Sequence, residues 1–465
     1  MLGKRGRCIG GCNTATRHFA LHESKHPFSD LRQGPFDSRQ KSRSLRVTAK
    51  YSVSAISTIR YIGSAMLKKN RLFTPGPTPL LPAAQFAMAA ANVHHRTADF
   101  EAIFRRTLAD LKTFIGTIND TVLLACSGTG AMEAAVSNLV KPGDKVLVLS
   151  AGKFGERWTG IAKAYSCKTE VLTMPYGQTF PLDQVASQLT TDVRCVYMQA
   201  SETSTGVQHD VQGVARAVRE LNSRGGDALL VVDAITGLGT MPFDVDAWGV
   251  DIILGGSQKA LMIPPGLAYL AASERAWKRM EEPHAPAYYF DLRKERKSAA
   301  KGESAYTPAI ALIAGMAAAF DFVRQMGNGD LAAGRDALIK NAQVTAAMTR
   351  AGAQALGLKL FASVPSSACT AICAPEGINS KVIINGFRDQ FDAVIADGQG
   401  EMLGKIFRVA HLGYYDYLDT LGMIGALEQI IAQAARPANF QFGMALKAAQ
   451  EVYADATGAA KRQGA

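Results

Sequence analysis

The sequence predicts an α/β protein in which helices cover a mostly parallel β-sheet, followed by a smaller α+β domain. Three observations indicate this fold class. Short apolar, strand-like runs alternate with helical patterns through the middle of the chain. The most apolar run, Leu229-Leu230-Val231-Val232, has no polar face and is typical of a strand that a parallel sheet buries on both sides. At 465 residues, 48% of them hydrophobic, the chain can fill one large core or two linked domains.

The elements of the sheet follow one another in order. Strands are expected at 122–125, 145–149, 170–173, 193–199, 228–232, 252–254 and 267–271. Helical patterns fill the gaps, for example at 100–115, 131–139, 158–165 and 211–221. This alternation predicts right-handed crossovers that place helices on the faces of the sheet.

A break rich in charge and proline at 281–302 separates the two predicted domains. Beyond it we expect helices at 309–325, 331–356 and 420–433 and strands at 370–374 and 406–409. Near the start, Thr74-Pro75-Gly76-Pro77-Thr78 contains prolines that exclude a helix. The predicted organisation is an arm at 66–90, a large domain at 91–308 and a small C-terminal domain at 309–465 that includes the linking helix.

Residues 1–65 form a basic leader that contains serine, is poor in acidic residues and holds most of the formal net charge of +11. An organelle-type transit segment has this composition. The alternative is a disordered extension, or a start site assigned too far upstream, because Met66 is followed by a polar segment of the kind that often begins a folded domain. The remaining chain is nearly neutral and gives no argument for nucleic-acid binding. We expect a cytoplasmic protein, or an organelle-targeted one if the leader is genuine.

The seven cysteines, an odd number without a C-x-x-C motif, indicate reduced thiols rather than a disulfide framework. Cys369 and Cys373 are close in sequence but have no nearby histidine, so they do not form a zinc site. His94 and His95 lack a third ligand, and no metal is expected. The best apolar stretch, 309–320, is too short to cross a membrane, and no membrane association is expected.

The most informative segment is Gly256-Ser257-Gln258-Lys259-Ala260, which follows the strand expected at 252–254. Open α/β sheets place their ligand sites at the carboxyl ends of the strands. A lysine there can attack a carbonyl and form a Schiff base, because burial or nearby positive charge favours its free amine. The alternative is a solvated lysine in a loop.

Two other strand ends have residues that could bind a cofactor together with such a lysine. Asp233 ends the most apolar strand, where a carboxylate needs a cation or hydrogen-bond donors. The protonated ring nitrogen of pyridoxal phosphate (PLP) is such a cation, although a helix N-cap is an alternative use for this aspartate. Ser127-Gly128-Thr129-Gly130-Ala131 begins a helix after the first strand and could bind phosphate, but ordinary β-to-α turns have the same composition.

Three further segments offer polar or flat side chains. Phe154, which lies between glycines, could cover a heterocycle or belong to the core. The segment 201–206 offers hydroxyls to a cofactor or forms a polar turn. Arg408 could bind a substrate carboxylate bidentately or form a structural salt bridge. Because four of the candidate segments follow successive strands, we expect one cleft at the carboxyl edge of the sheet.

In combination these segments resemble the class V (fold-type I) PLP-dependent aminotransferases, and most closely the alanine–glyoxylate, serine–glyoxylate and serine–pyruvate group. The resemblance spans about residues 72–433. It rests on Thr74-Pro75-Gly76-Pro77-Thr78, Ser127-Gly128-Thr129-Gly130-Ala131, Glu202-Thr203-Ser204-Thr205-Gly206, Asp233-Ala234, Gly256-Ser257-Gln258-Lys259-Ala260 and Pro264-Pro265-Gly266. It implies the fold-type I PLP-transferase fold, with a large domain built on a mostly parallel seven-stranded sheet.

The resemblance implies a role for each candidate residue. Lys259 would carry the Schiff base with PLP and later move the proton at the substrate Cα. Asp233 would pair with the pyridine nitrogen, and Arg408 would bind the substrate carboxylate. The other implied PLP contacts are Gly128, Thr129, Gly130 and Gln258 at the phosphate, Phe154 and Ile235 at the ring, and Thr203 at the ring hydroxyl. Phe154 stands where the group often has tryptophan, so we expect stacking with less overlap.

The resemblance also implies a homodimer with shared active sites, because Thr307 in Tyr306-Thr307-Pro308 would reach the phosphate held by the neighbouring subunit. Ser304 stands where the group can have a tyrosine, and it would not supply that tyrosine's phosphate contact.

The implied reaction is ping-pong transamination from a small amino acid, alanine or serine, to glyoxylate or pyruvate. A cysteine desulfurase or another class V enzyme is the nearest alternative, but desulfurases typically have histidine where this chain has Gln258, and they need a mobile cysteine. A non-catalytic PLP-fold binding protein is a second alternative. The joint presence of Lys259, Asp233 and Arg408 argues against it.

Overall fold

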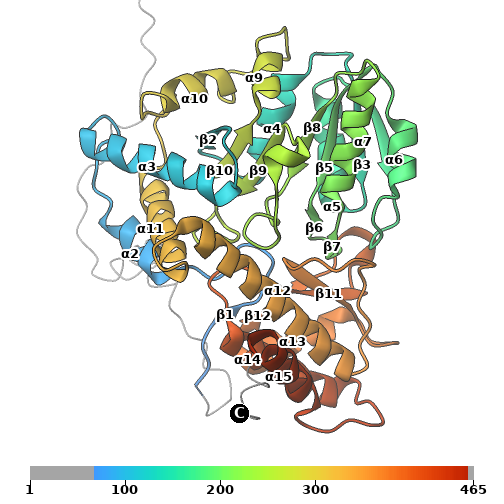
Figure 1. The fold of residues 1–465 in the computed structure, drawn as a ribbon. Coiled ribbons are helices and arrows are strands. Elements are labelled where there is room, and N and C mark those ends of the chain that lie inside the picture. The colour runs from blue at the N-terminus through green and yellow to red at the C-terminus, as the bar shows by residue number, and fades with distance from the viewer. Residues whose placement is uncertain (1–66, 459–465) are drawn as a thin grey trace, which may run out of the picture. The chain divides into compact units, whose positions relative to one another are not determined.

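The computed structural model describes residues 67–458, and the leader expected at 1–65 lies outside the described residues. The described chain contains a large seven-stranded sheet covered by helices, and a smaller three-stranded sheet with its own helices (Figure 1).

The large sheet has the strand order β2-β10-β9-β8-β5-β3-β4. Its strands are β2 (Asp120–Leu124), β3 (Lys145–Ser150), β4 (Lys168–Thr173), β5 (Val193–Gln199), β8 (Leu229–Asp233), β9 (Ile252–Gly256) and β10 (Ala268–Ala272). Only β10 runs antiparallel to its neighbours, and the other four pairings are parallel. This sheet confirms the predicted fold class and all seven predicted strands.

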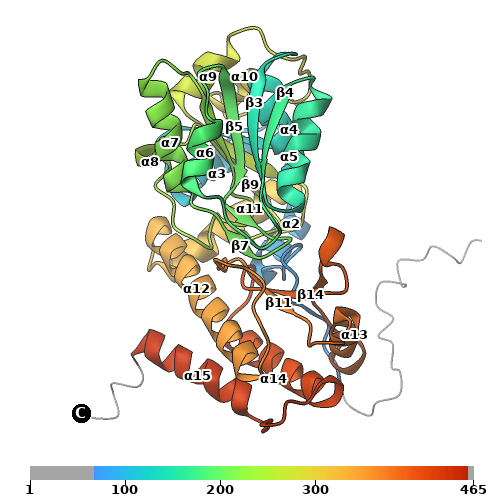
Figure 2. The ribbon, with the colours of Figure 1, turned by 90° about the vertical axis from the view of Figure 1, so that its right-hand side faces the viewer.

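Helices cover both faces of the large sheet (Figure 2). Side chains of β8 alternate between two cores: Leu230 and Val232 join one core, while Leu229 and Val231 join the other. The second core also contains Trp158. The helices of this part are α3 (Ala98–Ile115), α4 (Gly128–Leu139), α5 (Lys153–Ala164), α6 (Leu182–Gln188), α7 (Val211–Ser223), α8 (Val245–Trp248), α9 (Glu274–Met280) and α10 (Leu292–Ala299). Strands buried on both faces leave the strand ends as the place where polar groups can gather.

The smaller sheet is antiparallel, with the order β11-β14-β13. Its strands are β11 (Cys369–Cys373), β13 (Ala396–Asp397) and β14 (Ile406–Ala410). A third core, with Phe387 and Phe407 among its members, fills the space between this sheet and its helices. These helices are α12 (Leu331–Ala355), α13 (Ser380–Phe391), α14 (Tyr417–Ala434), α15 (Met444–Thr457) and the short 3₁₀ helix η3 (Gly400–Met402).

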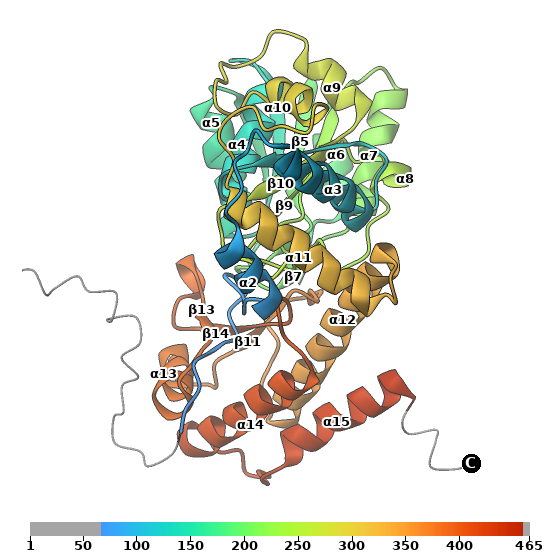
Figure 3. The same cartoon turned by 90° about the vertical axis from the view of Figure 1, so that its left-hand side faces the viewer.

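Two long helices follow the large sheet, of which α11 (Ile310–Met326) packs into the first core and α12 joins the first core to the third. Helix α11 packs against α3 and against α2 (Pro82–Ala90), as Figure 3 shows, and contributes Phe320 to the first core. Helix α12 contributes Leu338 to the first core and Met348 to the third. No single helix in residues 67–458 is long and apolar enough to cross a membrane; only the bent pair α11–α12 reaches that length and composition jointly.

The N-terminal arm also joins both parts. Strand β1 (Arg71–Leu72) pairs with β12 (Ala393–Val394), and Phe73 is buried in the third core. Leu81 belongs to the first core, and its backbone N–H donates to Met262 O at 2.9 Å. The chain between Phe73 and Leu81 therefore runs across the carboxyl edge of the large sheet. A small hairpin, β6 (Ser201–Glu202) and β7 (Val207–Gln208), extends from the same edge.

Helix α10 lies where the sequence predicts a break between domains, and this part of the prediction is wrong. The helix is highly charged and buries only Leu292 and Glu295, so its sequence has no broad apolar face. It begins because Asp291 accepts hydrogen bonds from the backbone N–H groups of Arg293 and Lys294. The start of this helix therefore depends on local capping by Asp291, which a search for apolar periodicity does not detect.

The arm gives a stability prediction. Phe73 is 4% exposed, and we expect Phe73→Ala to lower the free energy of unfolding by about 3–5 kcal/mol, as is typical of large-to-small changes in a core. Urea unfolding followed by circular dichroism measures this change. Ile118→Ala, at an 86% exposed side chain, serves as the control and should change stability by less than about 0.5 kcal/mol. Equal effects of the two substitutions would contradict an anchored arm.

Candidate active site

The candidate residues gather where the strands of the large sheet end. Gly128 begins α4 just after β2, Phe154 lies in the first turn of α5 after β3, and Thr203 follows β6. Asp233 is the last residue of β8, and Lys259 lies three residues beyond β9. The parallel strands β3, β5, β8 and β9 deliver their following loops to one edge, as the sequence predicts for this type of sheet.

Lys259 lies in a largely buried position under the N-terminal arm. Its Nζ donates a hydrogen bond to Pro75 O at 2.6 Å. Gly76 is required above it, since a Cβ at that position would lie 2.1 Å from Nζ. The Thr78 hydroxyl donates to Lys259 O at 3.1 Å and holds the arm to the lysine loop. Burial lowers the pKa of Lys259 to about 8, which favours the free amine that a nucleophile requires.

Asp233 is buried, with 6% of its surface exposed. Burial raises the pKa of its carboxyl group to about 7, while a hydrogen bond from the Ile235 backbone N–H at 2.9 Å opposes this rise. The charge of Lys259 also lowers the Asp233 pKa, so the two groups interact electrostatically. The carboxylate accepts only this one hydrogen bond from the described residues. A protonated heterocycle would supply the partner that a buried carboxylate needs.

Glycines at the start of α4 allow close packing against Ile235 and Cys126. A Cβ on Gly128 would lie 2.3 Å from Ile235 Cδ1, and a Cβ on Gly130 would lie 2.6 Å from Cys126 Sγ. Gln258 Oε1 is buried and has no hydrogen-bond partner among the described residues. Helix α4 begins at Gly128 without a side-chain cap, so its positive end faces the same region. Small residues, an unpartnered polar atom and a helix N-terminus together fit a phosphate-bearing cofactor.

The Phe154 ring is half-buried and packs against Arg157, a residue for which the sequence analysis predicts no role. The Arg157 guanidinium carbon lies 4.7 Å from the centre of the Phe154 ring. Arg157 also donates to the Thr129 hydroxyl at 3.2 Å, which links α5 to the first turn of α4. The sequence signal for Arg157 is its spacing of three residues from Phe154, which puts both on neighbouring positions of one helical turn.

Arg408 approaches the site from β14 in the smaller sheet and is 5% exposed. Its Nε and Nη2 donate to Asp397 O at 2.9 and 2.7 Å, and Nη1 donates to Thr203 O at 2.7 Å. Among the described residues it forms no ion pair, so the structural salt bridge offered as its alternative role is not observed there. Three of its five N–H groups are therefore directed at backbone carbonyls, and two remain for a carboxylate.

Of two other predicted features, Thr307 lies apart from this group and Cys369 adjoins it. Thr307 is exposed on the loop before α11 and is not hydrogen-bonded to the other candidate residues in the described chain. Its predicted contact with a second subunit stays a prediction. Cys369 is buried, and its thiol donates to Thr203 O at 3.7 Å. Burial raises the Cys369 pKa to about 11, so this residue is a protonated thiol rather than a mobile nucleophile.

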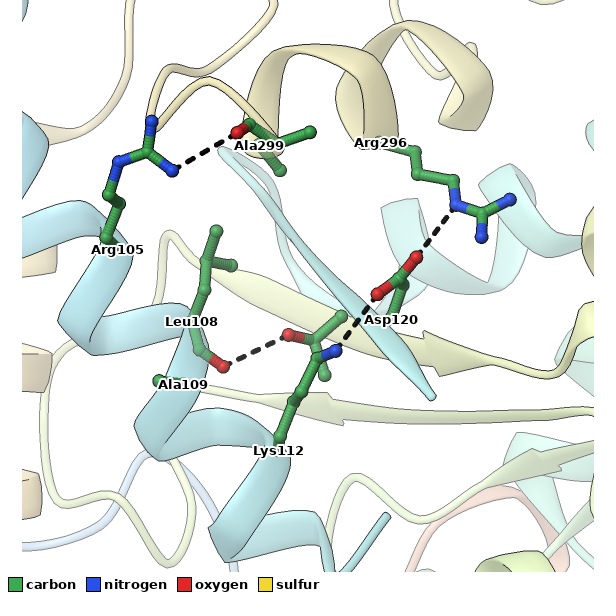
Figure 4. Close-up of a pocket in the computed structure, with 9 residues that line it drawn as sticks. Arg105, Leu108, Ala109, Lys112, Asp120, Arg296 and Ala299 are labelled. Atoms are coloured by element: carbon green, nitrogen blue, oxygen red, sulfur yellow. Dashed lines mark hydrogen bonds and ion pairs between the residues drawn. The ribbon is translucent and has the colours of Figure 1, made fainter. Parts of the chain in front are cut away.

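A separate hollow of about 390 Å³ lies between α3, α10 and β2 (Figure 4). Asp120 stands between two of its cations, pairing with Lys112 Nζ at 2.9 Å and with Arg296 Nε at 2.9 Å. None of the residues predicted for the active site lines it. Within residues 67–458, no cluster of three or more His, Cys, Asp or Glu side chains is arranged to hold a metal ion.

The comparisons with known proteins identify the family. The family model described as aminotransferase class-V matches residues 83–350. The chain is 37% identical to the soluble hydrogenase 42 kDa subunit of Anabaena cylindrica, a match that covers 83% of this chain and 99% of that protein. It is 34% identical to L-aspartate–glyoxylate aminotransferase of Paracoccus denitrificans, over 86% of this chain and all of that protein.

Two further matches agree with this result. Serine–glyoxylate aminotransferase of Methylorubrum extorquens is 32% identical over 77% of this chain and 90% of its own length. The crystal structure of a subgroup IV aspartate aminotransferase from Thermus thermophilus superposes with a TM-score of 0.73 at 35% identity, and covers 78% of this chain and all of that one. The chain belongs to the class V aminotransferase family, which confirms the resemblance found in the sequence. The family implies PLP as the cofactor.

Asp233 gives a pH-dependent prediction for the cofactor-free protein. Its pKa is raised in the folded state, so the folded chain binds more protons than the unfolded chain between about pH 4 and pH 7. The contribution of Asp233 to stability therefore falls as pH rises through this window. The Asp233→Asn variant has no carboxyl group to titrate at this position, so its stability does not fall for this reason. Relative to wild type, we expect the variant to gain about 1–4 kcal/mol in stability between pH 5 and pH 7.

Urea unfolding of both cofactor-free proteins at pH 5 and pH 7 measures the difference. The matched control is Asp183→Asn, which removes an exposed carboxylate in the first turn of α6. A difference between Asp233→Asn and wild type that stays constant with pH would show that Asp233 does not titrate in this window.

Proposed function

We propose that this protein is a PLP-dependent transaminase that moves an amino group from a small amino acid, alanine or serine, to glyoxylate or pyruvate in a ping-pong reaction. The observation that carries the proposal is the buried pair of Lys259 and Asp233 at the carboxyl edge of the sheet, where α4 also begins without a side-chain cap. Glyoxylate as the acceptor is supported by the names of the Paracoccus and Methylorubrum relatives.

In this proposal each residue has a physical task. When bound, PLP supplies the electron-withdrawing ring that stabilises negative charge at the substrate Cα. Asp233 would keep the ring nitrogen protonated, and Phe154 and Ile235 would pack against the ring. Gln258 and the first turn of α4, from Gly128 to Gly130, would bind the phosphate, and Thr203 would contact the ring hydroxyl.

Lys259 provides the amine that binds the cofactor and then carries the proton to and from the substrate Cα. Its lowered pKa keeps a useful fraction of the amine unprotonated near neutral pH. The hydrogen bond to Pro75 O gives this amine a defined position when it is free. Arg408 orients the substrate by binding its carboxylate with the two N–H groups that the backbone carbonyls do not use.

We further propose a homodimer in which Thr307 of each subunit contacts the phosphate in the other active site. The exposure of Thr307 supports this arrangement, as does the neighbouring group of aromatic side chains in which Tyr306 stacks on Tyr289 with ring centres 5.2 Å apart. The Tyr288 ring, whose centre lies 6.0 Å from that of Tyr306, is 78% exposed, so this aromatic group presents surface that a second subunit would cover.

The cysteine desulfurase alternative is less well supported. It requires a reactive thiol on a mobile segment, whereas Cys369 is buried within β11 and its pKa is raised. Cys373 is half-buried at the end of the same strand. Detection of a persulfide on either residue after incubation with L-cysteine would favour the alternative.

Visible absorbance tests the proposed function directly. The purified protein supplied with PLP should show a yellow absorption band that bleaches with alanine or serine and returns with glyoxylate. Aspartate belongs in the panel because the Paracoccus relative is named for it. We expect Lys259→Ala to lower turnover by at least a hundredfold, the lower range for loss of a positioned acid–base group. A wild-type protein without a band in excess PLP would overturn the proposal.

Arg408 gives a prediction about substrate binding. Arg408→Gln should lower kcat/KM for the amino-acid half-reaction by about ten- to a hundredfold, because it removes hydrogen bonds between charged groups. Stopped-flow measurement of the bleaching rate against substrate concentration provides this value. Arg388→Gln is the matched control, since Arg388 lies in the same part of the chain with 61% side-chain exposure. If the two variants had equal rates, Arg408 would not be the carboxylate-binding residue.

A further inference from the structure

Glu202 is a fully buried carboxylate to which the proposed reaction assigns no task. It is 0% exposed at the end of β6, and it forms no ion pair with the described residues. Its Oε2 accepts hydrogen bonds from the backbone N–H groups of Phe154 and Gly155, both at 3.1 Å. Its Oε1 accepts from the Ser204 backbone N–H at 3.2 Å and from the Ser204 hydroxyl. Burial raises the Glu202 pKa, and these donors oppose the rise.

These bonds cap helix α5 from a distant part of the chain. The residue at the N-cap position is Gly152, which has no side chain to bond to the first turn. Ser204 Oγ accepts from the Lys153 N–H at 3.0 Å, so the first three N–H groups of α5 all donate to Glu202 or Ser204. A negative charge at this end of a helix is also favoured by the helix dipole.

The fit between the two segments excludes other side chains. A Cβ at Gly152 would lie 2.5 Å from Glu202 Cδ and 2.6 Å from Ser204 Oγ. The glycine therefore allows the carboxylate to approach the helix end. The usual cap of a helix is a local serine or aspartate side chain, whereas here the cap comes from the β6–β7 hairpin.

The cap connects residues that are expected on different sides of the cofactor. Phe154 is held through its own backbone N–H, and its ring is the expected stacking surface. Thr203 lies between Glu202 and Ser204, and its carbonyl accepts from Arg408 Nη1 at 2.7 Å. The carboxylate of Glu202 thus fixes the relative positions of a ring-stacking residue, a ring-hydroxyl contact and the predicted substrate-binding arginine.

We propose that Glu202 is a positioning residue that sets the distance between Phe154 and Thr203, and thereby the orientation of the cofactor ring. This inference rests on the proposed function, since it assumes that PLP lies between these residues. In this proposal Glu202 acts through the backbone of α5 rather than by direct contact with substrate or cofactor. The charge of Glu202 also raises the pKa of Asp233.

The test measures PLP affinity in cofactor-free protein by fluorescence titration. Glu202→Gln keeps one oxygen for the Phe154 and Gly155 N–H groups but places an NH₂ group against the Ser204 N–H, whereas Glu202→Ala removes every acceptor. We expect E202A to bind PLP about tenfold more weakly than wild type, a change comparable to the loss of an aromatic contact. The affinity of E202Q should lie between those of E202A and wild type. The control, Glu156→Gln, removes an exposed carboxylate from the same helical turn and should change affinity less than twofold.

A double-mutant cycle separates positioning from general stability. If Glu202 acts through Phe154, E202Q and Phe154→Leu should affect PLP affinity less than additively when combined. The visible circular dichroism of bound PLP should also change in E202Q, because this signal depends on ring orientation. Additive effects with an unchanged dichroism spectrum would overturn the inference, even if E202Q lowers the unfolding midpoint. Should E202A fail to fold, E202Q carries the test alone.

The outcome for wild type distinguishes the two proposals. Wild-type protein that binds no PLP would contradict the proposed function itself. Wild-type protein that binds PLP, with E202Q equal to it in affinity and spectrum, would contradict only the role of Glu202.

Discussion

The site depends on the removal of two ionisable groups from water at one edge of a sheet. Burial acts in opposite directions on them, lowering the pKa of Lys259 and raising that of Asp233, so both charged forms are disfavoured in the cofactor-free protein. A cationic heterocycle beside Asp233 and a covalent bond at Lys259 would each remove one of these unfavourable conditions. The chain is thus prepared for a partner that satisfies both groups at once.

The architecture makes this burial possible. Because the strands of the large sheet are covered on both faces, water is excluded from all but their ends, and the parallel direction of β3, β5, β8 and β9 collects their loops at one end. The arm then closes over Lys259 through Pro75 and Gly76. The smaller sheet contributes Arg408, whose side chain donates to the Thr203 carbonyl in the β6–β7 hairpin.

Much of the fold could be predicted from the sequence because its signals are local. Apolar runs marked all seven strands, and the residues expected at strand ends lie at one edge of the sheet. Arg157 and Glu202 received no role beforehand, since the role of each depends on a partner from another strand end, Thr129 or the start of α5. Such contacts form between segments that are distant in sequence and meet only in the folded protein. Neither hydrophobic periodicity nor residue spacing predicts them. The roles predicted for Thr307 and for the phosphate-binding residues concern groups outside a single chain and stay predictions.

The course of the arm has a mechanical consequence. Phe73 is fixed in the core of the smaller sheet and Leu81 in the core of the large one, while the backbone between them accepts a hydrogen bond from Lys259. Seven residues separate these two anchors, and a chain extends by at most about 3.3–3.6 Å per residue, which limits how far apart the anchors can move. A movement of one core relative to the other would be transmitted to this segment and so to the Pro75 carbonyl that accepts from Lys259. The position of the Lys259 amine therefore depends on the distance between the cores of the two sheets.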